Sequence, residues 1–302
     1  MSKKEKVCPG LEYLPDEMAS DHITEGCMVL EGGAFRGVYS AGVLDALMKA
    51  DINLRCTIGV SAGAMNGFNY SAGHIGRSAR VNLRYRHDPH YVGVKAFRNN
   101  QGIIGFDFAF DQVTKDLPFD YERFYRDDRR FVAVASNVET GKAEYFEKGV
   151  CGDIFQAIRA SASLPYVSKP VNVEGKLCLD GGCSVKIPVR WAMAQGYERI
   201  VVIMTRGVNY RRDENSKHVL AKALYHSRPA FRAALCTSAR RANHEYQKID
   251  ELSRNGRIFL ILPSRQIDVS RFESDMEKLG RLYVLGYRDG QAAVPALREY
   301  LE

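Results

Sequence analysis

A serine flanked by glycines is the residue best suited to act as a nucleophile. Residues 59–63 read Gly-Val-Ser-Ala-Gly, between a β-branched run and a stretch rich in Ala and Gly. Small residues on both sides allow a sharp strand-to-helix turn that presents the Ser61 hydroxyl to a substrate carbonyl. The structural alternative is that Gly59 and Gly63 serve close packing while Ser61 acts as a helix N-cap.

A glycine-rich loop precedes this serine. Residues 31–37 read Glu-Gly-Gly-Ala-Phe-Arg-Gly and open a segment with helical spacing of apolar residues. Backbone N–H groups of such a loop, at a helix N-terminus, favour a phosphate or the oxyanion of an acyl-transfer intermediate. The loop has neither the glycine spacing of a dinucleotide fingerprint nor the Gly-Lys of a P-loop, which favours the oxyanion. A plain helix-start turn is the structural alternative.

A third candidate for chemistry, after the serine and the glycine-rich loop, is the carboxylate of Asp180. Asp180 follows the apolar residues 177–179 and precedes Gly181 and Gly182. An acid at the end of a strand in an α/β sheet lies where such folds place ligands and catalytic groups. Because an Asp-Gly pair is also a common turn sequence, Asp180 gains meaning only together with the two loops before it.

In this order, the three motifs resemble those of the patatin-like phospholipase family. Residues 159–165, Arg-Ala-Ser-Ala-Ser-Leu-Pro, also resemble that family's block between nucleophile and acid. The resemblance covers about residues 28–191. It implies a three-layer α/β/α sandwich with a mainly parallel central sheet, and hydrolysis of lipid acyl esters without metal or organic cofactor. Two positions depart from the commoner pattern, since Ala34 replaces a third glycine and Lys186 replaces an asparagine.

The resemblance also implies roles for single residues. Ser61 is the expected nucleophile, Asp180 its general base, and the backbone N–H groups of Gly32, Gly33 and Ala34 the oxyanion hole. A carboxylate with an ordinary pKa of about 3.9 is a weak base, so burial that raises its basicity would help. Further residues are expected to support these loops: Arg36, Gly37, Gly59, Gly63, Gly181 and Gly182. We expect Arg36 to orient the loop or neutralise a nearby acid, with a solvated first-turn side chain as the alternative.

Two other functions compete with this interpretation. A Ser-His-Asp triad has candidate histidines in His218, His226 and His244, which follow Asp180 in the order that an α/β-hydrolase requires. All three lie in basic, helical sequence, whereas a triad histidine is expected in a loop after a late strand. The second alternative is a non-catalytic protein of the same fold that binds lipid or a protein partner, and the intact Ser61 and Asp180 argue against it.

The elements around the motifs alternate between strands and helices, which indicates an α/β layered fold. Hydrophobic patterning predicts strands at 27–30, 56–60, 131–138, 143–146, 199–205 and 258–262, and helices at 38–47, 62–72, 151–162, 188–195 and after 217. We expect a polar N-terminal tail at 1–25, a patatin-like catalytic region at 26–206 and a mostly helical C-terminal extension at 207–302, packed on the same domain.

One segment outside the motifs is notably apolar. We expect residues 93–118 to form plain core, and the alternative is that they line an acyl pocket or form a lid. The segment contains six large apolar side chains that suit any of these roles: Phe97, Ile103, Ile104, Phe106, Phe108 and Phe110.

The chain carries 43 Lys and Arg against 36 Asp and Glu, a net charge of +7. Residues 206–241 alone hold nine of the basic residues and two of the acids. Such a cluster fits contact with phosphates, on nucleic acid or on anionic lipid headgroups, or a simply solvated helix surface. Because no nucleic-acid-binding motif accompanies the charge, we do not expect contact with nucleic acid, and the two interpretations that stay open are a docking face for an anionic membrane surface and a solvated surface that serves solubility.

Composition also indicates the compartment. The seven cysteines are scattered and form no C-x-x-C pair, so neither a disulfide framework nor a zinc site is expected. Residues 1–25 lack the apolar core of a signal peptide, and no apolar run approaches the ~20 residues that span a bilayer. We therefore expect a cytoplasmic protein, with peripheral membrane contact as an option, that uses no metal and no cofactor.

Overall fold

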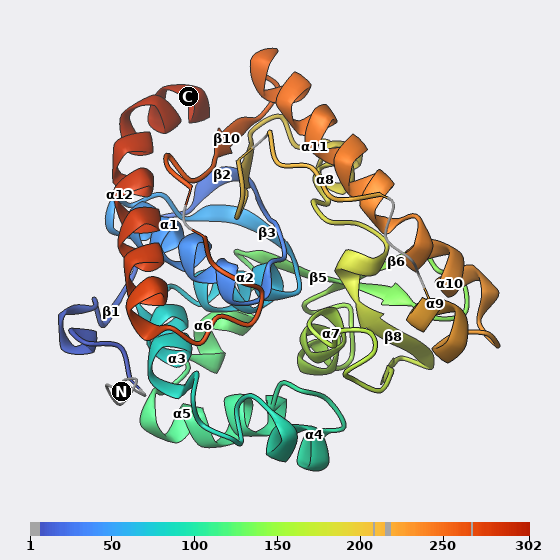
Figure 1. Cartoon of the computed structure of the whole chain (residues 1–302). Coiled ribbons are helices and arrows are strands. Elements are labelled where there is room, and N and C mark those ends of the chain that lie inside the picture. Colours follow the sequence, from blue (N-terminus) through green and yellow to red (C-terminus); the bar gives the residue numbers. More distant parts are fainter. Residues whose placement is uncertain (1–6, 208, 215–218, 267) are drawn as a thin grey trace.

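The computed structural model describes residues 7–207, 209–214, 219–266 and 268–302 (Figure 1). Its centre is an eight-stranded sheet in the order β10-β9-β2-β3-β5-β8-β7, with β6 paired to β5. The strands are β2 (Thr24–Leu30), β3 (Leu54–Val60), β5 (Arg130–Asn137), β6 (Ala143–Glu147), β7 (Val171–Val173), β8 (Lys176–Asp180), β9 (Ile200–Ile203) and β10 (Phe259–Ile261).

The five strands from β10 to β5 run parallel, whereas β6 and β8 are antiparallel to β5, and β7 is antiparallel to β8. The expected mainly parallel sheet is therefore confirmed. Successive side chains of a strand point to opposite faces, and the four apolar residues that end β2 divide accordingly. Met28 and Leu30 pack into one apolar cluster, and Cys27 and Val29 into another.

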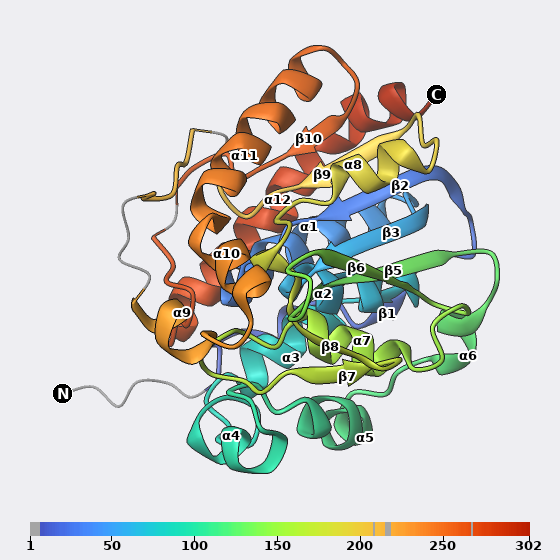
Figure 2. The same cartoon turned by 90° about the vertical axis from the view of Figure 1, so that its right-hand side faces the viewer.

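Helices cover both faces of the sheet, which gives the expected three layers (Figures 1 and 2). One face packs against α1 (Gly37–Lys49), α2 (Ala62–Ser71), α7 (Ile154–Ser161) and α12 (Met276–Leu301). The other packs against α8 (Val189–Ala194) and α11 (Ser238–Arg254). Four short helices precede β5 along the chain: α3 (Arg77–Tyr85), α4 (Val94–Asn100), α5 (Val113–Asp116) and α6 (Tyr121–Tyr125).

Residues at both ends of the described chain pack against this body. Strand β1 (Glu17–Met18) pairs with β4 (His74–Ile75), and Cys8 and Ala19 are buried, so residues 7–25 contact the region that carries the motifs. After residue 206 the chain adds β10 to the sheet edge, together with α9 (Val219–Leu224), α10 (Pro229–Cys236), α11 and α12. No helix among the described residues is long and apolar enough to cross a membrane.

Helices α1 and α12 lie unusually close to each other. A methyl group added at Gly42 would lie 2.3 Å from the carbonyl oxygen of Tyr283, and one added at Gly286 would lie 2.0 Å from that of Tyr39. Beside this contact the buried Asp45 accepts hydrogen bonds of 2.9 Å from the Gly76 N–H and the Tyr283 hydroxyl. Burial raises the pKa of Asp45 to about 7. Helix α12 is thus part of the core.

Candidate active site

Ser61 lies in the sharp turn between β3 and α2. Its backbone has φ 57° and ψ −122°, a conformation that costs a non-glycine residue roughly 1–3 kcal/mol. A methyl group on Gly63 would lie 2.5 Å from the carbonyl oxygen of Leu30, so the glycine is required by close packing. Although Ser61 occupies the N-cap position of α2, its hydroxyl makes no capping hydrogen bond. Close packing therefore explains Gly63, but helix capping does not explain Ser61.

Strand register brings Asp180 level with Ser61. Val60 pairs with Val134 on β5, and the next residue of β5, Ala135, pairs with Asp180 on β8. Ser61 therefore follows β3 at the same height at which β8 ends. Because β8 runs antiparallel to β5, Asp180 reaches this edge of the sheet from the opposite direction to Ser61. The sequence predicted a strand end at Asp180 but not this reversal.

The Asp180 carboxylate is buried and only partly satisfied. Its Oδ1 accepts a hydrogen bond of 2.8 Å from the Gly182 N–H, while Oδ2 has no well-aligned partner. Burial raises the pKa of Asp180 above its ordinary value. The ammonium of Lys186, the nearby Ser61 hydroxyl and the guanidinium of Arg271 oppose this rise. The result is a carboxylate more basic than an exposed one, close to the Ser61 hydroxyl.

The glycine-rich loop after β2 passes directly beside Ser61. A methyl group on Gly32 would lie 3.0 Å from the Ser61 Cβ, so only bare backbone fits there. Within the described chain, the N–H groups of Gly32, Gly33 and Ala34 donate no hydrogen bond. Ala34 has a φ of 49°, a left-handed conformation in which alanine is strained by roughly 1–2 kcal/mol. The alanine departure thus affects the conformation of the loop and leaves its N–H available.

A buried acid anchors the start of this loop. The Glu31 carboxylate accepts hydrogen bonds from the Thr205 N–H at 2.7 Å, the Thr205 hydroxyl at 3.0 Å and the Tyr246 hydroxyl at 2.7 Å. It ties the loop to the end of β9 and to α11. The sequence alone indicates no role for Glu31, because its partners lie 174 and 215 residues away along the chain.

Arg36 is not the solvated first-turn residue that the sequence left open. Its side chain is buried, with 8% of the residue exposed, and its Nε has no hydrogen-bond partner. Burial, together with the guanidinium groups of Arg206 and Arg271, lowers the pKa of Arg36 to about 10. Glu31 is close enough to oppose this shift, but the two form no ion pair. Arg36 is therefore a buried cation beside the glycine-rich loop, attracted by Glu31 but without an ion-pair partner among the described residues.

The block at 159–165 connects the serine turn to the acid. Ser161 accepts a hydrogen bond of 2.9 Å from the Ser61 N–H and donates one of 2.6 Å to the Val134 carbonyl. Two residues on, the Ser163 carbonyl accepts a hydrogen bond of 2.8 Å from the Asp180 N–H. Both positions are therefore fixed through the end of α7.

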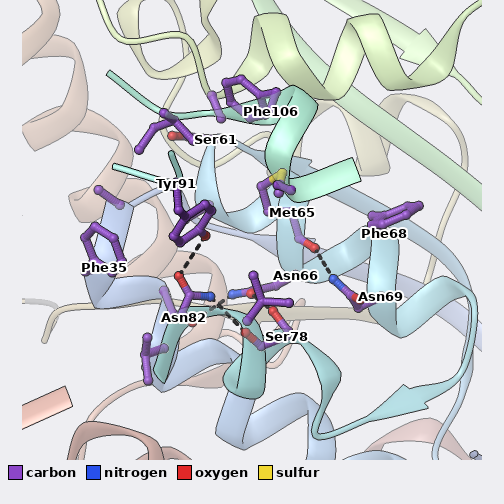
Figure 3. Close-up of a pocket in the computed structure, with 18 of the residues that line it drawn as sticks. Phe35, Ser61, Met65, Asn66, Phe68, Asn69, Ser78, Asn82, Tyr91 and Phe106 are labelled. Carbon is purple, nitrogen blue, oxygen red and sulfur yellow. Dashed lines mark hydrogen bonds between the residues drawn. The ribbon is translucent and has the colours of Figure 1, made fainter. Parts of the chain in front are cut away.

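An apolar cavity of about 80 Å³ opens beside Ser61 (Figure 3). In the close-up, Phe35, Met65, Tyr91 and Phe106 surround the space near the serine, and polar side chains lie on its side away from the serine. Of the six side chains expected from segment 93–118, three line this cavity: Ile104, Phe106 and Phe110. These three side chains line an apolar pocket, which was the alternative to plain core for this segment, whereas Phe97 is exposed.

A second cavity, of about 180 Å³, lies on the other side of Ser61. Ser61, Ala34 and Leu164 line both cavities. Asp180 lines this second one, together with four cationic side chains: Arg36, Lys186, Arg212 and Arg271. Nothing in the sequence indicated that Arg212 and Arg271 belong here, because they lie outside the motifs in a segment whose charge resembles an ordinary solvated surface.

The histidines considered for a triad lie elsewhere. His226 and His244 are exposed, and neither lines a cavity next to Ser61. His218 lies outside the described residues. The described residues also contain no group of His, Cys, Asp or Glu side chains that could hold a metal ion.

Comparison with known proteins fits this geometry. The family model for patatin-like phospholipases matches residues 28–193, more than half of the chain and all of the motifs. The chain belongs to the patatin-like phospholipase family. Residues 228–302 of this patatin-like protein match a second model, a domain of unknown function (DUF6363). The residues that line the cationic cavity therefore come from both matched regions and from the segment between them.

Among curated relatives, the uncharacterized protein YjjU of Escherichia coli K12 is 31% identical over 183 residues, which are 59% of this chain and 51% of YjjU. The lysophospholipase nte1 of Emericella nidulans is 28% identical over 58% of this chain and 12% of its own length. A probable lipid hydrolase, 463L of invertebrate iridescent virus 6, is 27% identical over 54% of this chain and 61% of its own.

Each match thus spans less than two thirds of the relative's length. A solved structure, VipD from Legionella pneumophila, aligns with 98% of this chain and 72% of its own, at 13% identity and a TM-score of 0.45.

Proposed function

We propose that this protein hydrolyses lipid acyl esters with Ser61 as nucleophile and Asp180 as general base. One observation carries the proposal: the Ser61 hydroxyl, which does not cap its helix, is held next to a buried carboxylate whose pKa is raised, at the junction of an apolar cavity and a loop whose N–H groups donate no hydrogen bond within the described chain. Membership of a family of phospholipases, and relatives named as a lysophospholipase and a probable lipid hydrolase, support the substrate class.

In the first half of the reaction, the Ser61 oxygen attacks the ester carbonyl carbon while its proton passes to Asp180. The carbonyl electron pair moves onto the oxygen, and the N–H groups of Gly32, Gly33 and Ala34 stabilise the resulting oxyanion. Collapse of this intermediate breaks the ester bond. The alcohol leaves with the proton from Asp180, and the acyl group remains on Ser61 with its chain in the apolar cavity.

In the second half, water attacks the acyl carbon and gives a proton to Asp180. The second oxyanion collapses, Ser61 leaves and recovers the proton, and the fatty acid is released. The apolar cavity would bind an acyl chain by burying it from water, at about 0.8 kcal/mol for each buried methylene group.

Substitution of both dyad residues tests this mechanism. With p-nitrophenyl butyrate, we expect Ser61→Ala and Asp180→Asn each to lower kcat by roughly 10³-fold or more. A fluorophosphonate probe should label Ser61 in the folded wild-type protein but not in Ser61→Ala. Unchanged hydrolysis in both variants would rule out the dyad, and failure of the probe to label the wild type would favour the non-catalytic alternative.

We further propose that α9 docks the protein on an anionic lipid surface. Val219, Leu220 and Leu224 are exposed on this helix, next to the exposed Lys222. Tyr225, which follows α9, accepts a hydrogen bond from the N–H of Tyr166, a residue that lines the cationic cavity. An apolar helix face flanked by basic residues close to the site is typical of interfacial binding.

Flotation with vesicles containing phosphatidylglycerol tests this docking. We expect binding that weakens as salt rises and that falls several-fold in Leu220→Asp. Val150→Asp, which makes the same change of charge at an exposed apolar residue outside α9, should leave binding unaffected. Equal or tighter binding to duplex DNA at the same salt concentration would contradict a lipid surface as the partner.

A further inference from the structure

The cationic cavity beside Ser61 carries more positive charge than the dyad uses. Four cations and one carboxylate line it, so its net charge is +3 when all of these groups are ionised. One cation is enough to neutralise the negative charge of Asp180, so three of the four cations are in excess. The remaining charge faces a space of about 180 Å³ that opens onto the nucleophile.

Two nearby acids, Glu31 and Glu245, offset part of this charge, but among the described residues neither forms an ion pair with a cation of the cavity. Glu31 is held by the Thr205 and Tyr246 donors, and Glu245 accepts the N–H groups of Lys186 and Ile187 at 2.8 and 3.1 Å. Within the described part of the chain, the Lys186 ammonium forms no hydrogen bond or ion pair.

The guanidinium groups are also poorly satisfied. Arg36 is more than nine-tenths buried, yet its side chain forms no hydrogen bond with any described residue. The buried Nε of Arg212 also has no hydrogen-bond partner, although the Tyr246 hydroxyl and Glu31 stabilise this cation and raise its pKa. A buried cation without a partner is costly, so the site gains free energy when an anion binds there.

We infer that this cavity binds the dianionic phosphomonoester of an acyl-glycerol-phosphate type of lipid and thereby selects such lipids over those with a choline headgroup. The inference rests on the proposed function, because it places the substrate ester at Ser61. Guanidinium groups bind phosphate with paired, charge-assisted hydrogen bonds, whereas a trimethylammonium group offers no acceptor and is repelled by the net positive charge.

The arrangement of the cavities fits a lipid of this kind. Ser61, Ala34 and Leu164 line both cavities, so an ester at Ser61 can extend its acyl chain into the apolar one and its headgroup into the cationic one. Two of the four cations lie outside the matched patatin region of 28–193, and Arg271 belongs to the matched domain of unknown function. That C-terminal region therefore supplies a wall of the headgroup site.

Arg271 gives the cleanest test because its side chain is exposed, so a substitution there leaves the core intact. Binding is measured by calorimetry at pH 8 in a Ser61→Ala background, which prevents turnover. The probes are octanoyl-glycerol-phosphate, octanoyl-glycerophosphocholine and inorganic phosphate. We expect the phosphomonoester lipid to bind at least tenfold more tightly than the choline lipid, and Arg271→Gln to remove most of this preference.

Arg254→Gln removes one exposed positive charge from the last turn of α11 and should leave the preference unchanged. Equal binding of the two lipids would overturn the inference, as would a preference that survives Arg271→Gln. Inorganic phosphate that binds with the same dependence on Arg271 while the lipids show no preference would assign the cavity to free phosphate and likewise overturn it. If the preference holds but the wild type hydrolyses neither lipid, the headgroup site stands and the proposed catalysis fails.

Discussion

Ser161 holds the backbone of Ser61 through its side chain. Its hydroxyl accepts a hydrogen bond of 2.9 Å from the Ser61 N–H and donates one of 2.6 Å to the Val134 carbonyl on β5. Ser161 is fully buried, so water cannot replace it. The strained φ of 57° at Ser61 is therefore fixed by a bond from the end of α7.

Ser161→Ala should leave two buried backbone groups unsatisfied. We expect a loss of about 2 kcal/mol in the free energy of unfolding and a fall of roughly tenfold in kcat, because Ser61 loses its support. Urea unfolding and ester hydrolysis measure the two effects. Ser163→Ala is the control, since that hydroxyl bonds only to the Arg159 carbonyl in the same turn. Equal kcat values in the two variants would contradict a positioning role for Ser161.

Gly63→Ala should disrupt the turn itself. Its new methyl group meets the carbonyl oxygens of Leu30 at 2.5 Å and Glu31 at 2.9 Å, which belong to the end of the central strand β2 and to the loop residue directly after it, and this backbone cannot move aside. We expect a loss of about 3 kcal/mol in stability, measured by thermal or urea unfolding. Gly67→Ala, one turn along α2, meets chiefly side-chain atoms and should cost clearly less. Equal losses would show that the backbone contact is not the cause.

Lys186→Met should move the pH dependence of hydrolysis. Asp180 acts as a base only when ionised, so activity is present above its pKa and is lost as pH falls through it. The Lys186 ammonium holds down the pKa of Asp180, which burial has raised. Its removal should therefore shift the acid limb of kcat/KM for a neutral ester upward by about one pH unit. Lys186→Arg keeps the charge and should keep the limb in place, whereas an unmoved limb in Lys186→Met would refute the coupling.

Ala109→Trp should shorten the accepted acyl chain. Ala109 is buried and lines the apolar cavity, so an indole there would occupy the space beside Phe106 and Phe110. We expect kcat/KM for p-nitrophenyl decanoate to fall at least tenfold relative to the butyrate. Phe97→Ala, an exposed position on the same segment, should preserve the ratio. An unchanged chain-length profile in Ala109→Trp would place the acyl chain elsewhere.

Asp45→Asn should make stability less dependent on pH. The pKa of Asp45 is about 7 in the folded protein and near 3.8 in the unfolded chain, so the folded state binds the extra proton between these values. Stability therefore falls as pH rises from 4 to 7, by about 4 kcal/mol in total, and stays level above. In the Asp45→Asn variant this fall should largely disappear in urea unfolding at pH 5 and 8. An equal fall in both proteins would assign the pH dependence to other groups.

The sequence pattern predicted those strands and turns whose formation depends on residues close together in the chain. Alternating and β-branched residues located β2, β3 and β9, and the glycine spacing located the turn at Ser61 because sharp turns need small residues. The paired strands β1 and β4, two residues each, carry no such pattern and were not predicted. The direction of β8 also depends on long-range pairing, so the sequence could place Asp180 at a strand end but not at the height of Ser61.

The sequence likewise could not predict which basic residues of the C-terminal part lie next to Ser61. Counting residues located a basic excess after residue 206 but could not separate Arg212, which reaches the site, from basic residues on the surface. Arg271 is drawn to the site by the hydrogen bond from the Phe35 N–H to its carbonyl and by contacts of Arg86 with the following two carbonyls. None of these partners is near it in sequence.

The close contact of α1 with α12 means that the residues matched as patatin-like, 28–193, do not make up the whole core around α1. A protein cut after residue 206 would keep the serine, the acid and the oxyanion loop, yet it would expose the glycine-lined face of α1 and the Asp45 carboxylate. Helix α12 lies in the second matched region, 228–302, which also contains Arg271 of the proposed headgroup site. Substitutions in that region can therefore alter the stability of the core and the proposed choice of lipid together.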